Sequence, residues 1–305
     1  MKKFLAIFFA LILVVSMVAC DVSKSEDPTE KPTEQPTTAE TKAEAESKTE
    51  ANTTEDTAAE TTSETTAETT SETEATTEGD AEDPFKDMSV MTYDEYAAAE
   101  MDTPVVIEAY VQATQSWWND KIVVYLQDAD GAYFAYNMAC SEADAAKLVP
   151  GTKIQVKGYK GEYAGEVEIL DATFTFVENG DTYIATATDV TAILGNEEEL
   201  AKKMNIFAAF KGLTVVASKD ASGNDVAFLY KWNGSGTEGD DLYFSVTDGT
   251  NTYSFTVESY LCGKDTDVYK AVKALNIGDK IDAEGFLYWY NGANPHITSV
   301  KVITE

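Results

Sequence analysis

Few residues in this chain have side chains that do acid–base or nucleophilic chemistry at neutral pH. Its 305 residues include one histidine, His296, and three cysteines, and all 22 basic residues are lysines because the sequence contains no arginine. A catalytic or metal site that needs two histidines from one chain is therefore excluded, and so is bidentate recognition of phosphate by arginine. We expect His296, which enters the last strand, to be a structural histidine with a hydrogen-bond partner.

Two of the cysteines, Cys140 and Cys262, occupy equivalent places at the ends of two similar hairpins. Equivalent positions in two domains normally lie too far apart for a disulfide, and a catalytic thiol usually needs a nearby histidine. We predict that both are small buried hydrophobic residues.

Acidic side chains are abundant, because 54 Asp and Glu residues give a net charge of −32. The turns at Asp128/Asp130 and Asp240/Asp241 offer oxygen ligands for calcium, but neither has the ligand spacing of a complete calcium loop. Among so many carboxylates, a close pair says nothing specific about glycoside cleavage. The sequence also has no Gly-rich phosphate loop, nucleophile elbow or zinc motif. We therefore predict a protein that is not an enzyme and has no cofactor or metal.

The first 19 residues have the organisation of a signal peptide. Lys2 and Lys3 precede an apolar run from 4 to 18, which is short for a membrane span of about 20 residues. The run ends in Met17-Val18-Ala19-Cys20, which resembles the lipobox of bacterial lipoproteins, although Leu is usual where Met17 stands. The resemblance implies cleavage before Cys20, a lipid on its side chain, and a mature chain anchored outside the bacterial cell membrane. A plain secretory signal or an uncleaved anchor is the alternative.

Residues 20–85 form a linker of very different composition. Thr, Glu, Ala and Ser dominate it, and residues 21–84 include 20 acidic residues and four lysines. A segment with so little apolar surface cannot offset the loss of chain entropy on folding, and its like charges extend it. We predict a disordered acidic tether that lifts the folded part away from the membrane. A solubilising tail of no required length is the alternative.

The remaining chain contains two similar units. Residues 123–140 and 243–262 each alternate apolar and polar residues around an Asp-containing turn, which is the pattern of a β-hairpin. A short helix follows each hairpin, capped by Ser141 in the first unit and by Asp265 or Thr266 in the second.

The other predicted elements also come in matching pairs. First strands are expected at 105–113 and 206–217, fourth strands at 151–158 and 278–285, final hairpins at 159–176 and 286–303, and leading helices at 93–100 and 197–204.

Each unit therefore reads strand, strand, strand, helix, strand, strand, which is the order of an OB-fold, a five-stranded partly closed barrel. We predict a mainly β protein with two tandem OB-fold-like five-stranded barrels and short helices, preceded by the disordered linker. The predicted barrel domains are 86–178 and 179–305. In this arrangement the chain resembles tandem OB-fold surface lipoproteins of Gram-positive bacteria, an uncharacterised type.

Aromatic residues beside Asn and Asp are the candidate ligand-binding residues. OB-folds bind oligomers across the face of strands 2 and 3, between the strand 1–2 and strand 4–5 loops, and all four tryptophans fall in or beside those loops. Indole faces pack on the apolar face of a sugar ring, while amides and hydroxyls bind its hydroxyl groups. The predicted ligand-binding residues are Trp117, Trp118, Tyr159, Tyr163, Trp232, Asn233, Tyr288, Trp289, Tyr290 and Asn291.

Alternation along a strand limits how many of these rings are exposed. Either Trp289 or its two tyrosine neighbours must face the core. One of Trp117 and Trp118 is likewise expected to pack inward.

We predict from these features a non-catalytic surface lipoprotein whose barrels bind an extracellular glycan or cell-wall polymer. A protein-interaction or structural lipoprotein, with a surface protein as partner, is the first alternative. Oligonucleotide binding, by analogy with other OB-folds, is the third hypothesis. It ranks last because an acidic chain without arginine lacks the clustered positive charge that phosphate binding needs.

Overall fold

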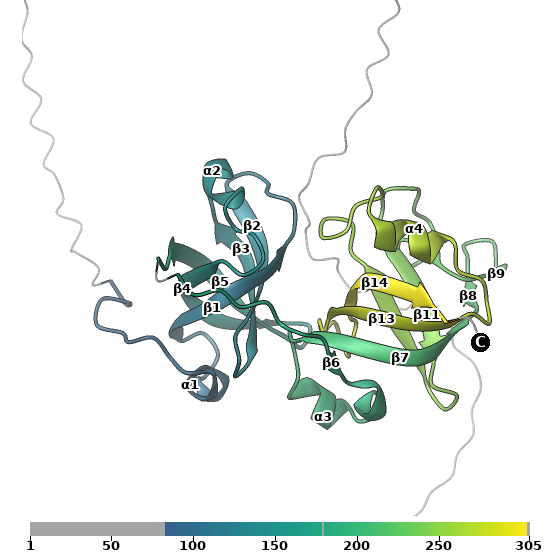
Figure 1. The fold of residues 1–305 in the computed structure, drawn as a ribbon, viewed down its shortest axis with the longest axis horizontal. Helices are drawn as coiled ribbons and strands as arrows, with labels where there is room; N and C mark the ends of the chain where they lie inside the picture. The colour runs from purple at the N-terminus through teal and green to yellow at the C-terminus, as the bar shows by residue number, and fades with distance from the viewer. Residues whose placement is uncertain (1–82, 179, 304–305) are drawn as a thin grey trace, which may run out of the picture. The chain divides into compact units, whose positions relative to one another are not determined.

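The computed structural model describes residues 83–178 and 180–303. These residues form a mainly β structure of two closed five-stranded barrels with a few short helices (Figure 1), which confirms the predicted fold class. Both barrels belong to one compact unit of the chain. The signal peptide, the lipidation site Cys20 and the linker up to residue 82 lie outside the described residues, so these remain predictions.

The first barrel is closed by the order β1-β2-β3-β5-β4. Its first strand closes the barrel, because β1 pairs with β4 through its first half and with β2 through its second half. All its pairs are antiparallel except β3 with β5. This is the strand order of an OB-fold. The strands are β1 (Pro104–Thr114), β2 (Lys121–Gln127), β3 (Ala132–Ala139), β4 (Lys153–Tyr163) and β5 (Glu166–Phe176).

Two short helices, α1 (Tyr93–Ala98) and α2 (Glu142–Ala145), cover opposite ends of this barrel (Figure 1). Thr92 and Glu95 form a capping box at the start of α1, and Ser141 caps α2 as predicted. The buried Lys160 ammonium donates to three backbone carbonyls at the end of α1, at 2.8 to 3.0 Å. A cation at a helix C-terminus is favourable, so Lys160 fastens α1 to the barrel.

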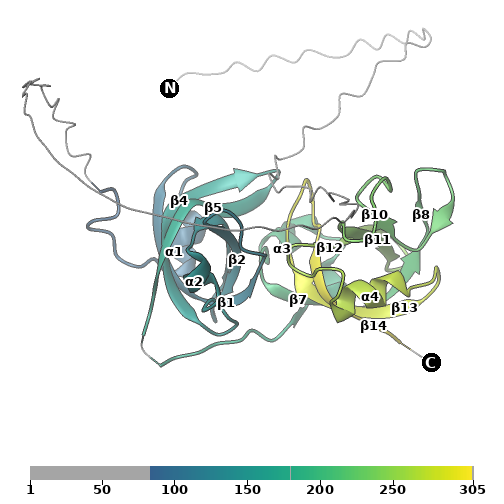
Figure 2. The same ribbon diagram turned by 90° about the horizontal axis from the view of Figure 1, so that it is seen from above.

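The second barrel has the same strand order, because β7 pairs with both β11 and β13 and thereby closes the ring β7-β11-β12-β14-β13. Thr266, one of the two predicted caps, begins the helix between the third and fourth of these strands. This helix crosses one end of the barrel beside β14 (Figure 2). The main elements are β7 (Phe207–Val216), β11 (Leu242–Thr247), β12 (Thr252–Val257), α4 (Asp267–Lys273), β13 (Lys280–Phe286) and β14 (His296–Val302).

Small additions surround this second barrel. The segment between β7 and β11 contains the two-stranded sheet β8–β9, and β10 extends the main sheet by pairing with β11. The additional elements are β6 (Thr188–Asp189), η1 (Thr191–Ile193), α3 (Glu197–Ala201), β8 (Ser218–Lys219), β9 (Asp225–Val226) and β10 (Leu229–Tyr230).

Some predicted boundaries differ from the structure. The fourth strand of the first unit runs on to Tyr163 instead of ending at residue 158, so Tyr159 lies within β4 and the hairpin turn is Ala164-Gly165. The third strand of the second unit ends at Val257, and Cys262 lies in the turn that follows. Both differences shift a strand end while the order of elements stays as predicted.

Candidate functional site

The outward face of β2 and β3, where OB-folds bind oligomers, is covered in the first barrel. Val123, Tyr125 and Phe134 are buried and form one cluster with Phe286 of the second barrel. Their partly buried neighbours also come from both barrels, namely Ala113, Tyr136, Phe207, Leu261 and Tyr288. The Tyr125 and Phe286 rings stack at 4.4 Å between centroids. In this barrel the binding face therefore serves as a docking face for the second barrel.

A hydrogen bond between His296 and Tyr125 crosses the contact between the two barrels, which we call the joint. The Tyr125 hydroxyl lies 2.6 Å from His296 Nδ1, and both side chains are buried. Tyr288 stacks on the imidazole at 4.1 Å between centroids. Burial lowers the pKa of His296 to about 3, because a charged imidazole would lose its hydration there. The prediction of a paired structural histidine is thus confirmed.

The two strand 4–5 turns pack against each other. The Trp289 backbone N–H donates to the Glu166 carboxylate at 2.8 Å, and the Asn291 N–H donates to the Ala164 carbonyl at 2.6 Å. A Cβ atom added to Gly165 would lie 2.7 Å from Trp289 Cδ1, so the turn fits closely under the indole. Trp289 is only 6% exposed, and it is the member of the Tyr288–Tyr290 triplet that faces inward.

The corresponding face of the second barrel carries hydroxyl groups and is accessible in part, since Thr256 on this face is buried and its hydroxyl donates to Asn294. Ser245 and Thr247 of β11 are half-buried, while their partners Ser254 and Thr252 of β12 are exposed. The Ser245 hydroxyl contacts Ser218 and the Thr247 hydroxyl donates to Asn251. Within the described residues, the hydroxyls of Thr252 and Ser254 have no protein partner. They are free to bind an external group.

An ordered loop, residues 231–241, borders the start of β11. Its own backbone bonds close it, including Lys231 N–H to the Asp241 carbonyl at 2.8 Å. The buried Tyr269 of α4 also holds the loop in place. The Tyr269 hydroxyl donates to the Asp240 carbonyl at 2.8 Å and accepts from the Gly239 N–H at 2.9 Å. An ion pair between Lys273 and Glu238 adds a second link.

This loop presents Trp232 and Asn233 to solvent. The indole is 52% exposed, while the Asn233 side-chain oxygen accepts from the Ser235 N–H and hydroxyl. A large exposed ring on an internally bonded loop loses little conformational freedom when it binds. Loop 231–241 therefore presents an exposed indole on a backbone that is already held in one conformation.

Three tyrosines gather near the same end of the second barrel. Tyr290 is 38% exposed and lies 6.1 Å from Tyr163 of the first barrel, between ring centroids. Burial and the nearby carboxylates Asp241 and Glu258, with a contribution from Tyr290, raise the pKa of Tyr243.

The predicted residues of the first barrel lie apart from this group. Trp117 packs on the barrel core and its indole N–H donates to the Cys140 carbonyl at 2.8 Å, whereas Trp118 is 43% exposed. As expected, one of the two rings faces inward. Tyr159 is half-buried within β4 and makes an edge contact with Phe85.

The burial of the β2–β3 face of the first barrel has a sign in the sequence, which the prediction of an alternating hairpin did not use. Residues 122–126 of β2 form a continuous apolar run, Ile-Val-Val-Tyr-Leu, rather than an alternating one. Such a run is typical of a strand buried on both sides. In β11 the alternation Leu-Tyr-Phe-Ser-Val-Thr leaves a polar face, and the structure leaves this face accessible in part.

No metal centre emerges from the described residues, since no group of three or more His, Cys, Asp or Glu side chains there could hold a metal ion. Cys140 and Cys262 are free and buried, and burial raises the pKa of each thiol to about 11. Both therefore pack as small hydrophobic residues, as predicted. No helix among the described residues is long and apolar enough to cross a membrane.

No protein-family model matches the chain, and no curated protein matches it. Solved structures match at low identity. The hypothetical protein ygiW from E. coli is 18% identical, with 30% of this chain and 91% of that chain covered and a TM-score of 0.23. The p204 HINb domain is 14% identical, with coverages of 67% and 98% and a TM-score of 0.31.

A murine DNA-binding protein bound to double-stranded DNA is 13% identical, with 66% of this chain and 96% of that chain covered and a TM-score of 0.29. At these identities and TM-scores the matches carry no argument about ligand or activity. By its own strand order, the chain folds as a tandem of two OB-fold-like barrels.

Proposed function

We propose that this protein is a non-catalytic surface lipoprotein whose second barrel binds an extracellular glycan or cell-wall polymer. One observation carries the proposal: of the two equivalent strand faces, the first is buried under the other barrel, while the second has exposed hydroxyls at Thr252 and Ser254. The first barrel then acts as a platform, and the ligand contacts belong to the second.

The chemistry of this face favours a sugar chain. Trp232 offers an apolar ring for the C–H face of a sugar. Thr252 and Ser254 offer hydroxyls that donate and accept, and Asn291 beside Tyr290 adds an exposed amide. Neutral hydroxyls on the strand face and an exposed indole on a loop of the same barrel support a neutral polyhydroxylated ligand over a phosphate backbone, which would need clustered cations.

The surface location rests on the sequence. The lipobox-like Met17-Val18-Ala19-Cys20 and the acidic linker support a lipid on Cys20 and a tether between the membrane and the barrels. We expect radiolabelled palmitate to label the wild-type chain in cells. Labelling that persists in Cys20→Ser would overturn the anchor.

Native affinity electrophoresis tests glycan binding. The full chain is run through gels that contain different polysaccharides or solubilised peptidoglycan fragments. We expect at least one polymer to retard the wild type, and Trp232→Ala to weaken the retardation about tenfold or more, as removal of a central aromatic contact does.

Trp118→Ala is the matched control. Trp118 has a similar exposure, 43% against 52% for Trp232, but lies on the first barrel, so its removal should leave retardation unchanged. If Trp118→Ala rather than Trp232→Ala abolished retardation, the placement on the second barrel would be wrong. If no polymer retarded the wild type, a protein partner at the cell surface would replace the glycan.

A further inference from the structure

The first barrel has a pocket that lies outside the covered strand face and shares no residue with the proposed glycan face. Its volume is about 440 Å³, and it is lined by β3, α2, β5 and the turns beside them, with Asp120, Ser141, Asp144, Phe174 and Phe176 among the lining residues. This volume is of the size that small-molecule sites occupy. The pocket combines two carboxylates with two aromatic rings.

The backbone around the pocket is fixed by contacts on both sides of Cys140. The Cys140 N–H donates to the Asp120 carbonyl at 2.9 Å, and the Cys140 carbonyl accepts from the Trp117 indole at 2.8 Å. Asn119 and Asp120 both have positive φ, 46° and 59°, a conformation that Asn and Asp tolerate better than other side-chain-bearing residues. Asp120 is thus held at the pocket by a specific turn.

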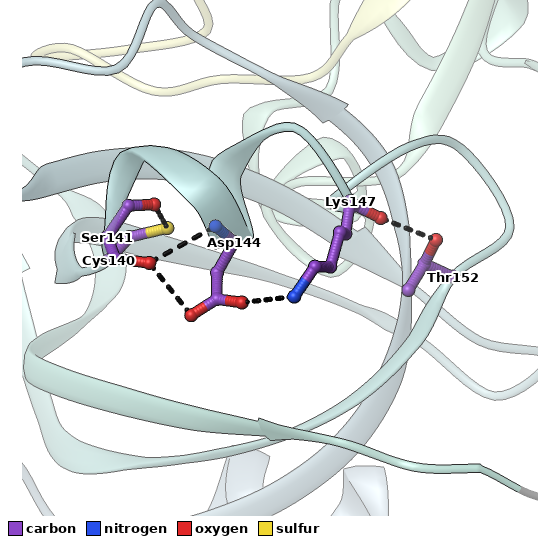
Figure 3. A network of polar contacts seen from close by, with 5 residues as sticks. All are labelled: Cys140, Ser141, Asp144, Lys147 and Thr152. Atoms are coloured by element: carbon purple, nitrogen blue, oxygen red, sulfur yellow. Dashed lines mark hydrogen bonds and ion pairs between the residues drawn. The ribbon is translucent and has the colours of Figure 1, made fainter.

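The second carboxylate, that of Asp144, is also held in place (Figure 3). One of its oxygens accepts from the Ser141 hydroxyl at 2.9 Å, and the other pairs with the Lys147 ammonium at 2.8 Å. These contacts, that of Lys147 first, lower the pKa of Asp144, so the group is ionised at neutral pH.

The protein's own lysine shows what kind of group this pocket attracts. The Lys147 ammonium lies 5.5 Å from the centroid of the Phe176 ring while it pairs with Asp144. The Phe174 ring meets Phe176 edge to face at 5.2 Å. A carboxylate beside an aromatic face stabilises an ammonium by both charge and the ring quadrupole. Within the described residues, no cation pairs with Asp120.

The same observations exclude other ligands. Two carboxylates against one lysine leave an excess negative charge, which repels anions. Burial and the Asp144 charge raise the pKa of Cys140 to about 11, so its thiol is not a nucleophile at neutral pH. The described residues hold no cluster that could bind a metal ion.

We propose that this pocket binds a small ligand with a primary ammonium group, such as an amino sugar, which pairs with Asp120 and packs on the rings of Phe174 and Phe176. The ammonium group of the ligand supplies a cationic partner for the Asp120 carboxylate. Lys147, which pairs with Asp144, lies over the same Phe176 ring. It therefore competes with the ligand ammonium for that ring and so limits affinity.

Calorimetric titration of the full chain tests this with two probes that differ in one charge. Glucosamine carries the ammonium, and N-acetylglucosamine carries a neutral amide on the same ring. We expect glucosamine to bind and N-acetylglucosamine not to bind, and we expect binding to weaken as salt rises because the contact is partly exposed.

Three variants locate the site. Asp120→Asn should weaken glucosamine binding about tenfold, as loss of a charge-assisted bond does, whereas Asp130→Asn removes the same charge from an exposed turn outside the pocket and should change nothing. Lys147→Met removes the competing cation and should strengthen binding a few-fold.

Equal binding of both probes, no binding of glucosamine, or an Asp120→Asn variant that binds as well as wild type would overturn the proposal. Weaker binding in Lys147→Met would do the same, because it would make Lys147 a ligand contact instead of a competitor. None of these outcomes depends on retardation by polysaccharides, so the pocket and the glycan face are tested separately.

Discussion

His296 contributes one buried hydrogen bond between the two barrels, to Tyr125. This makes the stability of the joint depend on acid pH. The pKa of His296 is about 3 in the folded chain against an ordinary value near 6.5. In the unfolded chain the imidazole binds a proton below that ordinary value, while in the folded chain it does not. The stability that neutral His296 contributes is therefore complete above pH 6.5 and is lost as the pH falls toward 3.

Replacement by phenylalanine isolates this effect. His296→Phe keeps a ring in the joint but cannot titrate, so wild type should lose about 2 kcal/mol relative to the variant between pH 7 and pH 5. Urea unfolding of both chains at the two pH values measures the difference. An unchanged difference would show that His296 is protonated as easily in the folded chain as in the unfolded one.

Glu258 titrates in the opposite sense. Burial, followed by the nearby Asp241, raises the pKa of Glu258 to about 8, so its carboxyl is protonated in the folded chain at neutral pH. Its contribution to stability is complete below the ordinary pKa near 4.3 and is lost as the pH rises through 8.

Glu258→Gln keeps a neutral side chain of the same shape that can still accept from the Leu261 N–H. Between pH 6 and pH 8, wild type should lose about 2 kcal/mol of unfolding free energy relative to this variant. Chemical unfolding at both pH values gives the answer, and parallel pH curves for the two chains would mean that Glu258 is ionised in the folded state.

Sequence patterns predicted the burial of single residues where a strand rule applied. Alternation required that either Trp289 or its neighbours face inward, and Trp289 does. The rule did not reveal what Trp289 meets, because the Gly165 turn lies 124 positions away in the chain. Local periodicity shows which side of a strand is buried, and it carries no information about a partner from the other barrel.

Loop 231–241 shows the same limit at the scale of an element. The sequence placed Trp232 in or beside the strand 1–2 loop of the second unit, and the structure shows that this loop is closed by backbone bonds and held by Tyr269. The tyrosine was predictable only as a residue of a helix. Its hydroxyl reaches the loop because α4 lies across the end of the barrel.

Tyr269→Phe removes that hydroxyl and keeps the ring. Two backbone groups, the Gly239 N–H and the Asp240 carbonyl, lose a partner, which should cost about 1–2 kcal/mol and speed hydrogen exchange of the Gly239 amide. Retardation by a bound polymer should weaken as well, because Trp232 loses its support. Urea unfolding and amide exchange measure the first two effects.

Tyr253→Phe is the control for this prediction, because the Tyr253 hydroxyl donates to Asp248 in an exposed turn. It should change stability by much less and leave the Gly239 amide unaffected. Equal effects of the two variants would contradict the role assigned to Tyr269.

For the whole molecule, the strand order of both barrels could be predicted from hairpin and helix-cap patterns. Their different roles could not be predicted, since both were expected to present ligand faces. The apolar run in β2 is the one local sign that the first face is covered, and the aromatic cluster around Tyr125 and Phe286 explains why.

The fit of the two turns at the joint can be tested with one methyl group. Gly165 and Gly249 both have positive φ, 90° and 94°, but only at Gly165 would a Cβ meet a neighbour, the Trp289 ring. Gly165→Ala should therefore destabilise the chain about 1–3 kcal/mol more than Gly249→Ala. The Gly249 variant has the strain of a positive φ but no contact between the added methyl group and a neighbour. Equal losses in urea unfolding would mean that the joint is loose.

Hydrogen exchange of the full chain, with and without solubilised peptidoglycan fragments, tests the central claim most directly. If the second barrel carries the open binding face, added fragments should slow exchange in residues 231–241, in β11 and β12, and in residues 290–292. The β2–β3 face of the first barrel is already buried and should not change. Slowing confined to the first barrel, or no slowing in the second, would contradict the account.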